Sequence, residues 1–230
     1  MNREPVLGAI LARIGAASGD RPVSLVAASK SQPASALQAL AAAGQRAFGE
    51  NYVQEALGKQ LELAKLALEW HMIGPLQSNK CAEVARHFDW LQSLDREKLI
   101  APLDRARPEG MPPLNVLIEV NLDDEASKSG CAPGAVFALA AKIARAPRLR
   151  LRGMMAIPAP SPDHEQRRAA FARLRELFEA LRREYTQVDT LSMGMSDDFE
   201  LAITEGATMV RVGTALFGPR GRKQAAGNGE

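Results

Sequence analysis

The fold of this chain is best approached from one short apolar run that ends in a lysine, Val23-Ser24-Leu25-Val26-Ala27-Ala28-Ser29-Lys30. Gln32-Pro33 follows one residue later, and the proline ring ends the extended segment by removing an amide donor and disfavouring helix at the residue before it. A lysine at the carboxyl end of a buried strand, just before a helix, holds its amine at the mouth of a pocket. Lys30 is therefore a candidate Schiff-base lysine; a solvated lysine at a strand end is the alternative.

The same pattern of a short β-type run followed by a longer helical stretch repeats along the chain. Strands are predicted near Val23–Ser29, Arg46–Phe48, Glu69–Ile73, Trp90–Gln92, Asn115–Asn121, Arg150–Met154, Thr190–Ser192 and Met209–Val212. Helices are predicted at Val6–Ala17, Pro33–Ala43, Tyr52–Leu66, Asn79–Arg86, Arg96–Arg105, Pro133–Ala144, His164–Arg183 and Asp197–Glu205. Ala43-Gly44 and Glu205-Gly206 are typical of glycine C-caps.

Eight strand–helix units in a chain of 230 residues predict an α/β fold of one domain, a closed (β/α)8 TIM-type barrel with an extra N-terminal helix. We expect the barrel to span residues 1–220 and residues 221–230 to form a disordered tail. The Arg46–Phe48 strand is weak, so an open doubly wound sheet is the structural alternative. The sequence disfavours it because no G-x-G-x-x-G motif follows the first strand.

The bulk composition excludes several classes of protein. A formal net charge of +2 with interspersed charges gives no electrostatic basis for binding nucleic acid. Cys81 and Cys131 are far apart in sequence, so we expect free thiols, no metal site and a reducing compartment. Without a secretory signal or an apolar run of about 20 residues, we expect a cytoplasmic protein with no membrane segment.

In a barrel of this type, residues at the carboxyl ends of the strands form the active site. The seventh and eighth strands end in Ser192-Met193-Gly194-Met195-Ser196-Asp197-Asp198 and Arg211-Val212-Gly213-Thr214. Ser196 is expected at the start of a helix as its N-cap, and Gly213 and Thr214 offer an amide and a hydroxyl. Together they predict a phosphate-binding cradle, although glycine and serine are also common in ordinary turns.

A lysine beside a phosphate cradle indicates two chemistries, a cofactor-free Schiff-base aldolase or a protein that binds pyridoxal 5′-phosphate. Arg211 favours the second, because a permanently charged guanidinium facing the pyridine nitrogen would keep that nitrogen unprotonated. A carboxylate partner inside the barrel is the alternative role for Arg211. Asp197 and Asp198 are interpreted as charges at a helix start rather than as an acid/base pair.

Several long motifs resemble the pyridoxal-phosphate homeostasis proteins over residues 5 to 220. They are Val26-Ala27-Ala28-Ser29-Lys30, Phe48-Gly49-Glu50-Asn51-Tyr52-Val53-Gln54-Glu55, Trp70-His71-Met72-Ile73-Gly74-Pro75-Leu76-Gln77-Ser78-Asn79-Lys80, Ser127-Lys128-Ser129-Gly130, Leu191-Ser192-Met193-Gly194-Met195-Ser196-Asp197-Asp198 and Val210-Arg211-Val212-Gly213-Thr214-Ala215-Leu216-Phe217-Gly218. The resemblance implies a barrel like the N-terminal domain of bacterial alanine racemase.

The resemblance further implies pyridoxal phosphate bound as a Schiff base to Lys30. Its phosphate would be held by Ser196, Gly213 and Thr214, with Arg211 towards the pyridine nitrogen. Asn51, His71 and Met193 complete the expected cofactor-binding set; on residue type alone, helix capping and core packing are the alternatives for Asn51 and His71. Such proteins act in intracellular vitamin B6 homeostasis and affect amino-acid pools, so we expect no catalytic residues.

A weak enzyme that acts on amino acids, as a racemase or by elimination, is the other hypothesis. Alanine racemases take a second acid/base tyrosine from an additional β-domain, which we do not expect in this chain. The only tyrosines, Tyr52 and Tyr185, lie at predicted helix ends. We therefore expect a monomeric carrier with apo pyridoxal-phosphate enzymes as recipients. Lys128, in the loop after the fifth strand, is a candidate for the transfer step, and a charged loop residue without a role is the alternative.

Overall fold

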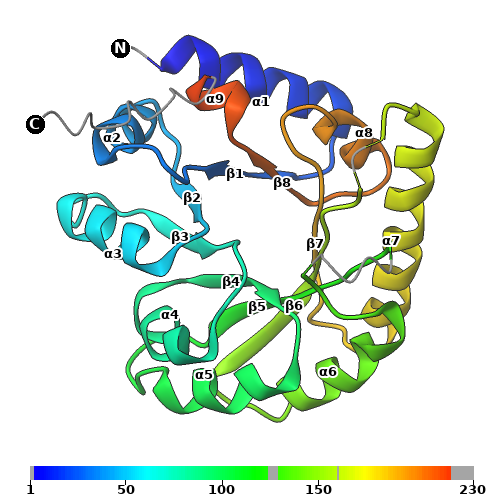
Figure 1. Ribbon diagram of the computed structural model, residues 1–230. Helices are drawn as coiled ribbons and strands as arrows, with labels where there is room; N and C mark the ends of the chain where they lie inside the picture. Colours follow the sequence, from blue (N-terminus) through cyan, green and yellow to red (C-terminus); the bar gives the residue numbers. More distant parts are fainter. Residues whose placement is uncertain (1–2, 124–128, 160, 219–230) are drawn as a thin grey trace, which may run out of the picture.

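Eight parallel strands close into a barrel in the computed structural model, which describes residues 3–123, 129–159 and 161–218 (Figure 1). The strands are β1 (Ser24–Ala28), β2 (Ala47–Glu50), β3 (Glu69–Met72), β4 (Trp90–Leu94), β5 (Leu114–Glu119), β6 (Leu149–Met155), β7 (Thr190–Ser192) and β8 (Met209–Val212). Each strand pairs with the next along the chain, and β1 also pairs with β8, with Val26 opposite Arg211. The prediction of a TIM-type barrel is confirmed.

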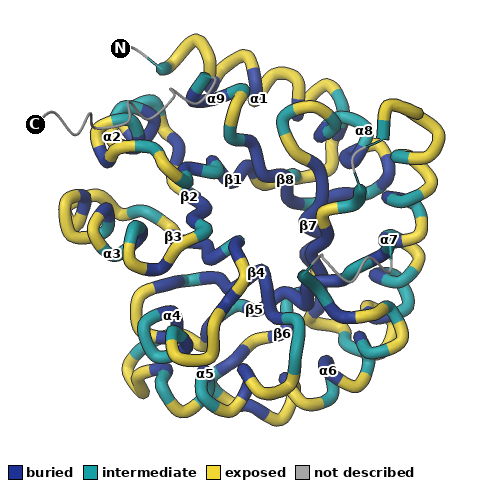
Figure 2. Tube along the Cα trace, in the orientation of Figure 1, coloured by how far each residue is buried: buried dark blue, intermediate teal, exposed yellow. Residues whose placement is uncertain are grey.

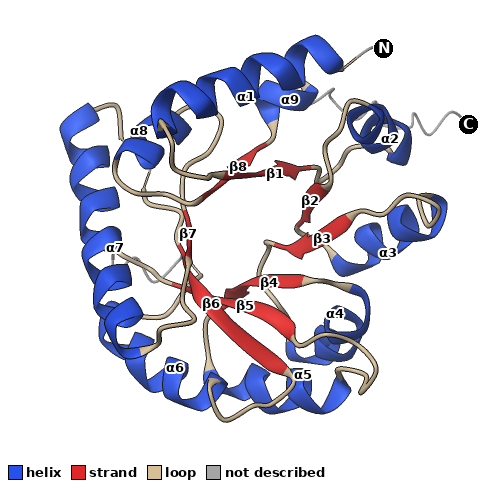
Figure 3. Ribbon diagram, turned by 180° about the vertical axis from the view of Figure 1, so that it is seen from behind, coloured by secondary structure: helices blue, strands red, loops and turns tan. Residues whose placement is uncertain are grey.

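Helices surround the barrel and cover its outer surface, as the view from behind shows (Figure 3). The α-helices are α1 (Glu4–Ser18), α2 (Ala34–Ala42), α3 (Val53–Glu62), α4 (Cys81–His87), α5 (Ile100–Ala106), α6 (Val136–Ile143), α7 (His164–Glu184), α8 (Phe199–Thr204) and α9 (Thr214–Phe217). Short 3-10 turns precede α4, α5 and α6 at Ser78–Lys80, Glu97–Leu99 and Pro133–Ala135. The extra N-terminal helix, α1, is confirmed. None of the helices in the described ranges is both long and apolar enough to cross a bilayer.

Figure 2 shows that the chain is mostly buried along the barrel strands. Alternation along the strands divides their buried side chains into two layers. One set points outward and packs with the apolar faces of the helices into the main core, which includes Trp70 and Met72 of β3. A smaller apolar cluster fills the inside of the barrel; its buried members are Val26, Trp90, Leu117, Met155 and Met209. The interior is therefore a packed core rather than a pore.

Local backbone chemistry explains where several helices end. Gly44 and Gly206 follow α2 and α8 with φ of 108° and 104°, values that favour glycine, so both predicted glycine caps are confirmed. The long helix α7 starts after Asp163, whose carboxylate accepts hydrogen bonds from the amides of Glu165 and Gln166.

The prediction that Ser196 caps a helix is wrong. Helix α8 begins at Phe199, two residues after the predicted first helical residue Asp197, because Asp198 accepts the amide of Met195 and so holds residues 195–198 in a turn. Ser196 is thereby free to face β8 instead of capping a helix. The sequence analysis also missed α9, a single turn that follows Gly213 directly.

The first described residues pack against the last ones. Arg3, just before α1, donates to the carbonyl oxygens of Leu216 and Phe217, at 2.9 and 3.4 Å. Figure 1 shows α1 lying beside α9 across the β1–β8 edge. Lys128 and the expected tail at 221–230 lie outside the described residues.

Candidate functional site

A cavity of about 280 Å³ opens at the carboxyl end of the barrel and is the candidate site. Six of the eight predicted cofactor-binding residues line it: Lys30, Asn51, Ser196, Arg211, Gly213 and Thr214. They come from the ends of β1, β2, β7 and β8, so closure of the barrel brings together residues that are up to 184 positions apart in the sequence.

The backbone on both sides of Lys30 is held by charged groups from β2 and α3. Ser29 donates its hydroxyl to Glu50, and its carbonyl oxygen accepts from Lys59 Nζ at 2.8 Å. On the other side, the amide of Ser31 donates to Glu55 at 2.6 Å, and Ser31 has a φ of 63°, which is uncommon for a residue with a side chain. The Lys30 side chain, half-buried, extends from this fixed backbone to the cavity.

Lys59 is the centre of that arrangement. It is 5% exposed, and its Nζ lies 2.6 Å from Glu50 and 2.7 Å from Glu55. Burial raises the pKa of Glu50, whereas the hydrogen bonds from Lys59 and Ser29 oppose this rise. These paired charges stabilise the loop that carries Lys30, and we assign them no direct contact with a ligand.

The phosphate cradle predicted from the sequence has a specific geometry. Ser196 Oγ accepts hydrogen bonds from the amides of Gly213 and Ala215, each at 3.3 Å. These bonds are longer than the usual N–H···O distance of about 2.9–3.0 Å, so both amides can take a stronger acceptor. A Cβ at Gly213 would lie 3.1 Å from the Ala28 carbonyl oxygen, so glycine lets the backbone of β1 and that of the β8–α9 turn approach closely. The result is a small concave surface of amide and hydroxyl groups.

Arg211 points into the barrel from β8 and lines the floor of the cavity. It donates to Ser192 Oγ at 2.6 Å and to the carbonyl oxygen of Ala156 at 3.0 Å. Burial lowers the pKa of Arg211 to about 10, and the nearby carboxylates Glu119 and Asp198 oppose this change. The guanidinium therefore stays charged at neutral pH. Its hydrogen-bond partners are a hydroxyl and a carbonyl rather than the carboxylate considered as an alternative.

Glu119, at the end of β5, was not predicted as a site residue. It is 7% exposed, and within the described part of the chain its Oε2 has no hydrogen-bond partner. Burial raises its pKa to about 7; Asp95 adds to this rise and Arg211 opposes it. The sequence gave no signal for this role, because it does not reveal whether Glu119 or Val120 faces the barrel interior.

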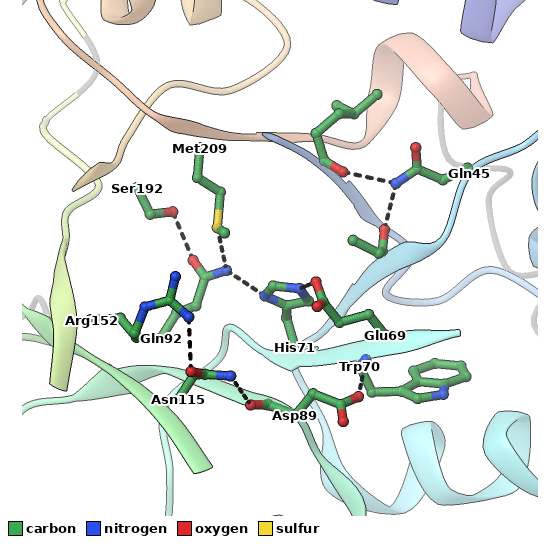
Figure 4. A network of polar contacts seen from close by, with 12 residues as sticks. Gln45, Glu69, Trp70, His71, Asp89, Gln92, Asn115, Arg152, Ser192 and Met209 are labelled. Carbon is green, nitrogen blue, oxygen red and sulfur yellow. Dashed lines mark hydrogen bonds and ion pairs between the residues drawn. The ribbon is translucent and has the colours of Figure 1, made fainter. Parts of the chain in front are cut away.

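The other two predicted cofactor-binding residues, His71 and Met193, do not line the cavity. Both have no exposed surface. His71 lies inside the barrel, where its ring stacks on Trp90 with 5.3 Å between the ring centroids, and it is hydrogen-bonded to Gln92 and Glu69 (Figure 4). Met193 packs in the main core.

Further lining residues are mainly apolar, and none of them was predicted to bind the cofactor. They include Gln32, Ile73, Ile157, Met195, Asp197 and Phe217. Ile157 and Met195 are 43% and 42% exposed, which is high for such side chains and gives the cavity an apolar rim. Neither tyrosine lines it: Tyr52 is 61% exposed, and Tyr185 is the C-cap of α7.

Comparison with known proteins gives consistent matches over most of the chain. Residues 11–221 match the family model of the alanine racemase N-terminal domain. The pyridoxal phosphate homeostasis protein of Pseudomonas aeruginosa is 59% identical over 198 residues, which are 86% of this chain and 85% of that protein. The pyridoxal phosphate homeostasis protein of Escherichia coli is 51% identical over 201 residues, 86% of either chain.

Among solved structures, PipY of Synechococcus elongatus with PLP bound is 40% identical and superposes with a TM-score of 0.80. The match covers 91% of this chain and all of that chain. The same barrel therefore exists in a relative whose structure contains the cofactor.

Proposed function

This chain belongs to the family of pyridoxal phosphate homeostasis proteins, and from this membership we propose that it binds pyridoxal phosphate (PLP) in the cavity and serves in intracellular PLP homeostasis. The observation that carries the proposal is that one cavity joins Lys30 to the amide cradle at Gly213 and Ala215. A relative with the same fold has been solved with PLP bound.

The residues present fit this cofactor in three respects. The two long amide contacts to Ser196 Oγ leave donors that a phosphate can use, at a position where a Cβ on Gly213 would crowd the β1 backbone. Lys30 supplies an amine on a fixed backbone, as a Schiff base to the aldehyde of PLP requires. Arg211 supplies a buried charged group that is not paired to a carboxylate. In this proposal Ser196, Gly213 and Thr214 would hold the phosphate, and Asn51, directly after β2, would contact the cofactor.

When bound, PLP supplies an electron sink for carbanion chemistry. Arg211 would weaken that sink if it faced the pyridine nitrogen, because a guanidinium does not give up its proton at neutral pH and so would leave that nitrogen unprotonated. Two-base racemisation also needs a second proton-transfer group opposite the lysine, and neither tyrosine of this chain lines the cavity. Both features favour a carrier of PLP over an efficient enzyme.

The first experiment measures the near-visible absorption of the purified protein with PLP added. We expect wild type to show an absorption band of bound PLP. Reduction with borohydride should then leave PLP attached to a peptide that contains Lys30, and no PLP should be attached in this way in Lys30→Ala. Lys80→Ala is the matched control, because Lys80 is a half-buried lysine that pairs with Glu83 away from the cavity. If wild type takes up no PLP, the proposal fails; if Lys30→Ala is labelled as wild type is, the lysine is misassigned.

The second experiment separates carrier from enzyme. Loaded protein is mixed with an apo PLP-dependent enzyme, and recovery of that enzyme's activity is compared with recovery from free PLP at the same concentration. A carrier restores activity at a rate that depends on its own concentration and leaves a panel of amino acids unchanged. Turnover of any of these amino acids by wild type, lost in Lys30→Ala, would support the weak enzyme instead.

A further inference from the structure

A continuous line of buried polar side chains crosses the inside of the barrel, from the floor of the cavity to the opposite end. Arg211 Nη1 lies 2.6 Å from Ser192 Oγ, and Ser192 Oγ lies 2.7 Å from Gln92 Oε1. Gln92 Nε2 lies 2.9 Å from His71 Nδ1, and His71 Nε2 lies 2.7 Å from Glu69 Oε1. Figure 4 shows Gln92 between Ser192 and His71, with the Glu69 carboxylate beside the His71 ring.

Simple donor and acceptor chemistry gives this line one direction. Arginine only donates, so Ser192 Oγ accepts from Arg211 and uses its own proton to donate to Gln92 Oε1. The Gln92 amide group then donates to His71 Nδ1, which must carry a lone pair. The ring proton of His71 is left on Nε2 and is donated to Glu69. Four hydrogen bonds thus run head to tail from a cation to a carboxylate.

The ends of the line differ in their surroundings. Arg211, Ser192, Gln92 and His71 are at most 4% exposed, whereas the Glu69 side chain is 47% exposed at the amino end of β3. The hydrogen bond from His71 lowers the pKa of Glu69, so this carboxylate is ionised at neutral pH. Bonds aligned in a low-dielectric interior polarise one another, and each is therefore stronger than it would be alone.

Reversal of one member would disrupt the others. If the Gln92 amide turned over, its oxygen would face the lone pair of His71 Nδ1, and its contact from Nε2 to Met209 Sδ at 3.2 Å would be lost. Stacking on Trp90, with 9° between the ring planes, holds the His71 ring in the orientation that the line needs. Gln92 is thus the central link, because it accepts on one side and donates on the other.

Glu119 supplies the reason why Arg211 needs such support. Its unpartnered carboxylate oxygen is buried near Arg211, and a salt bridge between the two would draw the guanidinium away from its present position. We propose that Gln92 and His71, which do not touch the cavity, are positioning residues that hold the Arg211 guanidinium against Ser192, where it faces the PLP ring. This inference rests on the proposed function, since it concerns the role of Arg211 towards the cofactor.

The test compares Gln92→Leu with Gln45→Leu in the PLP-loaded protein. Gln45 is also a buried glutamine of the barrel, but its amide donates to the carbonyl oxygens of Leu25 and Ala47 and has no link to Arg211 (Figure 4). Both variants lose buried hydrogen bonds, so both are expected to unfold at a lower urea concentration. Only Gln92→Leu is expected to shift the absorption band of bound PLP and to weaken PLP binding about tenfold.

Equal spectra and affinities for wild type and Gln92→Leu would overturn the inference while leaving PLP binding intact. Equal changes in both variants would also overturn it, since they would indicate general loss of packing. Failure of the wild type to bind PLP would instead refute the proposed function, which makes the two failures distinguishable.

A measurement on the wild-type protein without PLP keeps the inference testable even if Gln92→Leu does not fold. Nitrogen NMR of labelled histidine reports which ring nitrogen carries the proton, and the chain has three histidines, of which His87 and His164 are exposed. His71, assigned by comparison with His71→Asn, is expected to be protonated at Nε2 and bare at Nδ1. We also expect Arg211→Lys to shift the Nδ1 resonance of His71. A proton on Nδ1, or no shift in Arg211→Lys, would refute the directed line.

Discussion

Replacement of Glu119 by glutamine tests most directly the electrostatics around Arg211, beneath the cavity. Glu119 is a buried carboxyl group whose pKa is raised to about 7, chiefly because burial disfavours its charged form. Glutamine has nearly the same shape but no charge, so Glu119→Gln removes the ionisation and little else. Its effect on stability should therefore depend on pH.

The size and sign of the effect follow from the two pKa values. Glu119 has a higher pKa in the folded protein, about 7, than its ordinary value of 4.5. Folding therefore takes up a proton when the pH lies between these two values. The resulting contribution of Glu119 to the free energy of unfolding is complete below about pH 4.5 and is lost as the pH rises through about 7. At about 1.4 kcal/mol per pKa unit, the ionised carboxylate costs the wild type about 3 kcal/mol above pH 8, a cost that Glu119→Gln avoids.

Urea unfolding of both proteins without PLP, at about pH 5 and about pH 8.5, measures this difference. We expect Glu119→Gln to gain about 2 to 3 kcal/mol relative to wild type on going from the lower to the higher pH. Glu109→Gln is the control, because the Glu109 side chain is 86% exposed and its replacement should change the unfolding free energy little at either pH. An equally pH-independent effect at Glu119 would refute the argument that this buried carboxyl group titrates near neutrality.

Three further outcomes are expected. Gly153→Ala should cost about 4 kcal/mol or more in unfolding free energy, because a Cβ there would lie 1.8 Å from the Thr190 carbonyl oxygen and φ is 149°; a loss below about 1 kcal/mol would contradict this. Lys59→Met should cost about 3 to 5 kcal/mol in urea unfolding, because it leaves Glu50 and Glu55 without their shared cation; a cost like that of a surface lysine would refute it. Gly213→Val should weaken PLP binding about tenfold in a spectroscopic titration. Gly134→Val is its control, because nothing lies within 4 Å of a Cβ at that position, and it should leave the affinity unchanged. Equal affinities of Gly213→Val and wild type would refute the role of the close approach.

The sequence predicted the barrel well because its periodicity carries that information. The limits of β7 and β8 agree with the prediction, and even the weak Arg46–Phe48 segment is a strand, at Ala47–Glu50. That strand extends further than expected through Gly49 and Glu50, which have low β-propensity, because pairing with β3 supplies the hydrogen bonds that local propensity does not favour. Helix α9 escaped prediction because one turn is too short to show a helical period.

The polar interior was beyond prediction for a different physical reason. Which residues of a strand face inward depends on the register of the closed barrel, and a one-residue change moves every side chain to the other face. His71 was therefore predicted at the cofactor, although it lies in a deeper layer, and Gln92 and Glu119 were not singled out. Six cavity residues were predicted because strand ends meet at one rim whatever the register.

The arrangement around Lys30 bears on why such a site would hold a cofactor rather than turn over a substrate. Lys59 and Glu55 fix the backbone at Ser29 and Ser31, so only the Lys30 side chain is left to move at the anchor. Thr214 is exposed, whereas the Arg211 guanidinium is buried and locked to Ser192. In the proposed function Lys30 would supply the only covalent attachment of the cofactor, and the exposed Thr214 would leave the phosphate end open to solvent. Catalysis would also need a mobile acid/base group opposite the lysine, and among the described lining residues the only carboxylate is Asp197, an exposed residue in the turn before α8. This geometry favours retention followed by transfer.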